Sequence, residues 1–68
     1  MEIALKQQKI RDRVIYMFNV IPQKVDVGRY VVIIELREKD VNRLSLSVAE
    51  VEKDLSALVD RKVEVVLV

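Results

Sequence analysis

The 68-residue chain carries a formal net charge of +1 and contains neither cysteine nor histidine. These absences exclude disulfides, thiolate metal sites and a side chain that ordinarily titrates near neutral pH, so we expect no metal, no cofactor and no catalysis. A single core of this size supplies only about 3–5 kcal/mol, and without disulfides or metals the usual supplement is self-association.

Size and hydropathy predict a single domain without a membrane-spanning segment. Residues 1–68 are interpreted as one domain, because a chain this short supports one core and no linker or repeat divides it. The longest apolar runs, Val31 to Ile34 and Val65 to Val68, fall far short of the ~20 residues that cross a bilayer, and no signal peptide is visible. We therefore expect a cytoplasmic protein without a membrane partner.

The first predicted element is a helix over residues 2–18. Asn19 favours its end, because Asn tolerates the left-handed conformation that closes helices, and Pro22 follows. The apolar residues that recur at helical spacing, and that we expect in the core with Gln7 filling the gap between them, are Ile3, Ile10, Val14, Met17 and Phe18.

Two strands are predicted next. Lys24–Val27 alternates, and Gly28 then marks a tight turn, a kink or a close approach of two backbones before Arg29–Leu36. In the second segment one face carries Tyr30, Val32, Ile34 and Leu36, and the other carries Val31 and Ile33. We predict a central strand that is apolar on both faces and needs cover on both, from the helices or from another copy of the protein.

A charged loop over residues 37–42 and a strand over Arg43–Ser47 are expected to follow. Leu44 and Leu46 alternate with polar residues, which is typical of a strand with one wet face. This strand would form an antiparallel hairpin with residues 30–36. Glu35 would then lie where the outer face meets water or pair with a cross-strand Arg or Lys, and Arg43 is near enough in this hairpin to be that partner.

The sequence SVAE at residues 47–50 is a capping box and predicts the start of a second helix. Arg61 and Lys62 end this helix, and residues 63–68 form a last strand. The predicted buried stripe is Val48, Val51, Leu55, Leu58 and Val59, and the predicted water-facing residues are Glu50, Glu52, Lys53 and Asp54. The predicted fold is a small α+β sandwich of the α-β-β-(β)-α-β type, with the helices packed on a three- or four-stranded mixed sheet.

Residues 48–68 (VAEVEKDLSALVDRKVEVVLV) resemble the closing helix and strand of type II KH domains, in which an EIEKL-like helix precedes a GKKVEI-like strand. The preceding helix–strand–strand order also fits, so the resemblance implies a nucleic-acid-binding fold. The family grips the nucleic-acid backbone with a GxxG loop before this helix. Here the corresponding residues are Ser45, Leu46, Ser47 and Val48, so the resemblance assigns no such loop to this chain.

The same ending also resembles minimal nucleotidyltransferases, where ELLGRKVDLV is common. That family needs a Gly-Ser signature and paired metal-binding aspartates on a strand, and Arg29–Leu36 supplies neither.

Two functions are consistent with these observations. The first is a non-catalytic module that self-associates or docks on a protein partner through its apolar strand faces, at Val31, Ile33, Val66 and Val68. The alternative is a degenerate KH-like RNA- or DNA-binding protein. Its candidate contacts are the basic residues Lys6, Lys9, Arg13, Lys24, Arg29, Arg37, Lys39 and Arg43.

Overall fold

The structure is a computed structural model that describes residues 2–68. Its elements are α1 (Glu2–Phe18), β1 (Lys24–Val27), β2 (Val31–Leu36), α2 (Glu38–Arg43), α3 (Val48–Val59) and β3 (Lys62–Leu67). The predicted α+β class is confirmed in its three-stranded form, with one short helix added between β2 and α3.

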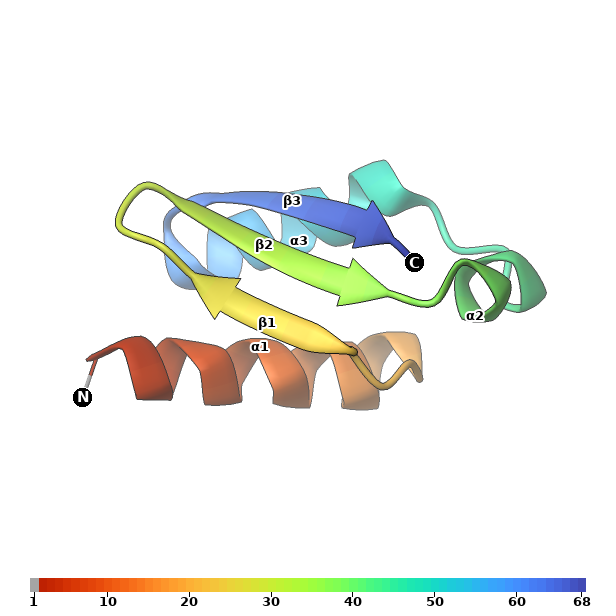
Figure 1. Cartoon of the computed structure of the whole chain (residues 1–68), viewed down its shortest axis with the longest axis horizontal. Helices are drawn as coiled ribbons and strands as arrows, with labels where there is room; N and C mark the ends of the chain where they lie inside the picture. Colours follow the sequence, from red (N-terminus) through yellow and green to blue (C-terminus); the bar gives the residue numbers. More distant parts are fainter. Residues whose placement is uncertain (1) are drawn as a thin grey trace.

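The sheet has the order β1-β2-β3, so β2 is the central strand, as the sequence predicts. β1 pairs with β2 antiparallel, with Lys24 opposite Glu35, and β3 pairs with β2 in parallel, with Val31 beside Lys62. Figure 1 shows α1 running alongside β1 and α3 behind β3, and the two helices also contact each other. The fold is therefore a helical layer packed on one sheet.

The core lies between these two layers. Every buried strand residue falls on the same face of the sheet, because side chains alternate along each strand and the register aligns the buried positions. Helix α3 contributes its predicted stripe, with Val51, Leu55 and Val59 buried and Val48 and Leu58 partly buried. The buried strand residues are Val25, Val27, Val32, Ile34, Leu36 and Val63.

Helix α1 buries less than the sequence predicts. Ile10 and Val14 are fully buried and Phe18 partly, but Ile3 and Met17 are 53% and 57% exposed, so their placement in the core was wrong. A 17-residue helix is about 25 Å long, whereas the four-residue strand beside it spans about 13 Å. The ends of α1 therefore extend past the strand that covers its middle.

The predicted helix boundaries of α1 and α3 are largely confirmed. Asn19 adopts the left-handed conformation after α1 (φ 59°), and the Ser47 hydroxyl accepts a hydrogen bond from the Glu50 N–H at 3.4 Å. Helix α3 ends at Val59, before the predicted Arg61–Lys62, because Asp60 already has a left-handed backbone (φ 54°). These local signals need only nearby residues, which explains their success.

The predicted strand at Arg43–Ser47, with its hairpin, is wrong. Residues 38–43 form α2, which buries Val41 and ends in a turn where Ser45 has a positive φ of 54°. That turn lets both Leu44 and Leu46 pack against the core, so two leucines spaced by two residues do not require a strand. Arg43 consequently lies on α2, 3.7 Å from Asp40, and not opposite Glu35.

Gly28 closes the connection between β1 and β2 as a tight turn. Its N–H donates to the Val31 carbonyl at 2.9 Å, and a Cβ placed on Gly28 would lie 2.7 Å from that same oxygen. The glycine is thus required by the close approach of two backbones, one of the predicted alternatives, and not by its φ angle.

We predict that Gly28→Ala lowers the free energy of unfolding by about 1–3 kcal/mol, because the new methyl group must displace backbone. The midpoint of urea denaturation measures this. Asp26→Ala, an exposed change on β1, serves as the control and should shift the free energy by less than about 0.5 kcal/mol. Equal midpoints for the two variants would contradict the close-approach explanation.

Candidate interaction surface

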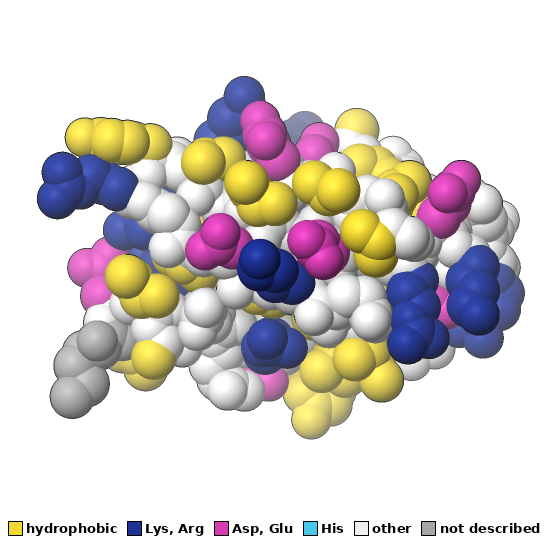
Figure 2. All heavy atoms as spheres, in the orientation of Figure 1, with side chains coloured by type: hydrophobic (Ala, Val, Ile, Leu, Met, Phe, Trp, Pro, Cys, Tyr) yellow, Lys and Arg dark blue, Asp and Glu magenta, His cyan; other side chains and the backbone are white. Residues whose placement is uncertain are grey.

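The face of the sheet that points away from α1 and α3 has no helix over it, and we call it the open face. Figure 2 views it directly, with hydrophobic side chains along β2 and β3 bordered by charged ones. It consists of the outward residues of the three strands: Lys24, Asp26, Val31, Ile33, Glu35, Lys62, Glu64 and Val66.

The four residues predicted for an interface all lie on or next to this face. Val31 and Ile33 are half-buried on β2, and Val66 and Val68 at the end of β3 are 43% and 59% exposed. The expectation that both faces of β2 need cover is thus met on one face by this chain's own helices. The apolar residues of the other face remain accessible.

Charges of both signs frame these apolar residues. Lys24 lies opposite Glu35 across β1 and β2, and Lys62 and Glu64 form an ion pair at 3.4 Å. With Asp26, the open face carries two lysines against three carboxylates. A face with this mixture has no charge preference for a polyanion.

Arg13, a predicted nucleic-acid contact, is instead bound within the protein. Its guanidinium donates two hydrogen bonds to the Asp54 carboxylate, at 2.9 and 3.0 Å, and ties α1 to α3. The hydrogen bonds from Arg13 hold the pKa of Asp54 below its ordinary value, against a smaller opposing effect of desolvation. The same contact raises the pKa of Arg13. Asp54 was predicted to face water, and this contact corrects that.

The remaining basic candidates are dispersed. Lys6 lies 3.8 Å from Glu2 on α1, where Lys9 also lies, whereas Lys24 belongs to the open face and Arg29 to the turn between β1 and β2. Three others gather around α2, where Figure 2 shows blue side chains at one end of the molecule. Arg37, Lys39 and Arg43 border two adjoining hollows there, which share Gln23 and Arg37.

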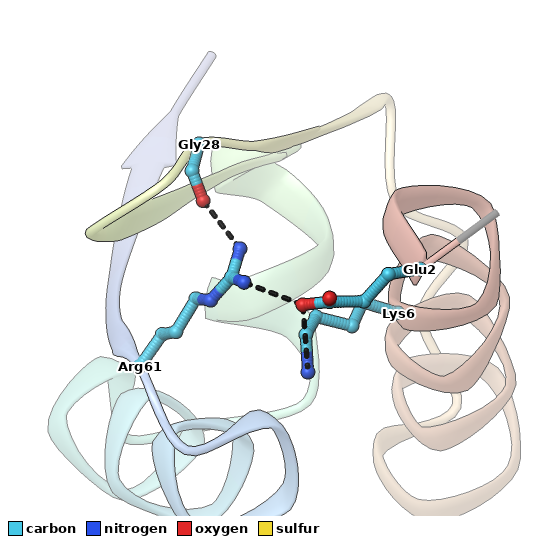
Figure 3. Close-up of polar contacts among 4 residues, drawn as sticks. All are labelled: Glu2, Lys6, Gly28 and Arg61. Atoms are coloured by element: carbon cyan, nitrogen blue, oxygen red, sulfur yellow. Dashed lines mark hydrogen bonds and ion pairs between the residues drawn. The ribbon is translucent and has the colours of Figure 1, made fainter.

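Arg61 was not predicted to make any contact, yet it joins three segments at the opposite end of the molecule. As Figure 3 shows, its guanidinium donates to the Gly28 carbonyl at 2.6 Å and to the Glu2 carboxylate at 2.7 Å. Arg61 thereby fastens the start of α1 to the turn between β1 and β2. We interpret Arg61 as a structural residue, since its guanidinium donates to acceptors within the protein.

Residues 2–68 bring together few of the side-chain arrangements that metal binding or catalysis uses. No charged or polar residue of this segment is buried, and its acidic residues form no cluster of three that could hold a metal ion. None of the described helices has both the length and the hydropathy to span a bilayer.

Comparisons of the chain with protein-family models, curated proteins and solved structures found no match.

The Arg13–Asp54 pair predicts a pH dependence of stability. Because the folded pKa of Asp54 lies below the ordinary value of about 3.9, its contribution is complete above that pH and is lost as the pH falls through the folded pKa. Asp54→Asn should therefore unfold at lower urea than the wild type at pH 6, and the difference should shrink below about pH 4. A difference that stays constant down to pH 2.5 would contradict this assignment.

Proposed function

We propose that this protein is a non-catalytic assembly module whose open face packs against the open face of a second copy. The observation that carries the proposal is the central strand β2, which is apolar on both sides and is covered by helices on one side only. An apolar patch framed by polar residues is typical of protein interaction sites. The absence of histidine and cysteine supports a binding role over a catalytic one.

Charge complementarity favours a second copy as the occupant. The framing charges are of both signs, so two copies related by a two-fold axis can place lysines of one opposite carboxylates of the other. The three strands cover a plate of about 15 by 20 Å, well under the ~800 Å² that a standard interface buries per partner. We therefore expect a weak dimer, with a dissociation constant in the micromolar range or above.

We predict that Val66→Lys weakens the dimer at least tenfold, about 1.4 kcal/mol, because it replaces an apolar side chain of the contact with a charge that must be desolvated. Sedimentation equilibrium over a micromolar-to-millimolar range measures the dissociation constant. Leu5→Lys is the matched control, because Leu5 is also exposed but lies on α1, outside the open face.

Leu5→Lys should leave the dissociation constant unchanged. A wild-type protein that stays monomeric at the highest concentration would overturn the proposal. Equal weakening by both lysine variants would overturn the assignment to the open face.

A second candidate function is binding of single-stranded nucleic acid at the α2 end. The observation that favours it is the group of Arg37, Lys39 and Arg43 beside the turn that precedes α3, where the KH resemblance places its nucleic-acid loop. Glu38 and Asp40 also lie in this segment and reduce its net charge to +1, three basic residues against two acidic ones. We rank this candidate below assembly for that reason.

Arg37→Glu combined with Lys39→Glu tests it in a fluorescence-anisotropy titration with a single-stranded RNA. Binding at this site should weaken steadily with salt, and the variant should lower the logarithmic salt slope by about 1.4, or about 0.7 for each lost phosphate contact. Lys9→Glu combined with Lys53→Glu makes the same change in net charge on α1 and α3 and is the control. Equal effects of the two pairs, or a wild-type affinity that does not respond to salt, would exclude the site.

A further inference from the structure

At both edges of the sheet, backbone groups form hydrogen bonds with helix side chains. On β1, the Val25 carbonyl accepts from the Gln7 side-chain amide of α1 at 3.1 Å. On β3, the Val63 N–H donates to the Ser56 hydroxyl at 3.1 Å, and the Val65 N–H donates to the Glu52 carboxylate at 2.9 Å. Glu52 was predicted to face water, and this contact corrects that prediction.

The β3 contacts occupy the groups that an added strand would need. In the parallel register, Val68 directs its N–H toward β2, where it donates to the Leu36 carbonyl at 2.9 Å. Alternate residues of a strand direct their N–H groups to opposite sides, so Val63, Val65 and Leu67 direct theirs to the free edge. Two of these three outward donors are thus occupied by α3.

Successive side chains of α3 can reach successive outward N–H groups of β3 because their spacings are similar. Residues four apart on a helix are about 6 Å apart along its axis, close to the ~6.6 Å between alternate residues of a strand. Ser56 and Glu52 therefore face Val63 and Val65 in turn. Four residues before Glu52 on α3 is Val48, which corresponds to the outward N–H of Leu67 on β3. The Val48 side chain cannot accept a hydrogen bond.

We propose that Glu52 and Ser56 close the β3 edge against the β3 strand of a second copy of this chain. An exposed edge strand pairs readily with a copy of itself, because the unpaired N–H and C=O groups of two such edges are complementary. Val63, Val65 and Val66 give β3 the composition of an aggregation-prone strand, so an open edge here would lead to extended sheets. This proposal concerns the edge alone and does not depend on the open-face dimer.

Removing both acceptors tests the proposal. The double variant Glu52→Ala with Ser56→Ala is compared with wild type and with Glu50→Ala, which removes an exposed carboxylate from the same helix. Sedimentation velocity should show about a twofold or greater rise in weight-average mass for the double variant, with thioflavin T binding, because edge pairing adds whole copies. Wild type and Glu50→Ala should show neither.

A double variant that is folded by circular dichroism and sediments like wild type would overturn the proposal. The result is separate from the open-face test, because a monomeric wild type can still gain mass when its edge is opened. If the double variant does not fold, amide hydrogen exchange of a single variant tests the edge contacts instead. Glu52→Ala alone should speed exchange of the Val65 amide about tenfold, as expected for one lost hydrogen bond, and leave the Val63 amide unchanged. An unchanged Val65 amide would equally overturn the proposal.

Discussion

The parallel pairing of β2 with β3 is the constraint on which the rest of the structure depends. Because both strands run in the same direction, residues 37–61 must return from one end of the sheet to the other, and α3 makes this crossing. α3 crosses on the face that α1 also contacts, so both long helices lie on one side. The central strand is apolar on both sides and is covered on one, which leaves the open face accessible.

The edges of the sheet and its open face leave different kinds of group without a partner inside the sheet. At the edges the groups left without a strand partner are backbone N–H and C=O, and Gln7, Glu52 and Ser56 satisfy three of them, on Val25, Val65 and Val63. On the open face the unmet groups are apolar side chains, which no polar contact can satisfy. In the proposed assembly, covering the open face buries hydrocarbon without breaking existing hydrogen bonds.

Local patterns in the sequence predicted β1, the central position of β2, the start of α3 and the apolar outward residues Val31 and Ile33 of the central strand. They failed over Arg43–Ser47, because two leucines spaced by two fit a strand and a turn equally well. They also assigned Glu52 and Asp54 to water, although these carboxylates contact Val65 and Arg13. Those partners lie 13 and 41 residues away in the sequence, and only the crossing of α3 over the sheet brings them together.

Two arginines contribute to holding the helical layer in place. Helix α1 buries only Ile10 and Val14 completely, so its attachment relies on polar contacts as well. Arg13 and Arg61 supply two of these, and both donate hydrogen bonds from their guanidinium groups to protein acceptors. With the net charge at +1, each arginine committed in this way lowers the positive potential available to a polyanion. Of the predicted nucleic-acid contacts, Arg13 is thus already engaged by Asp54 within the helical layer.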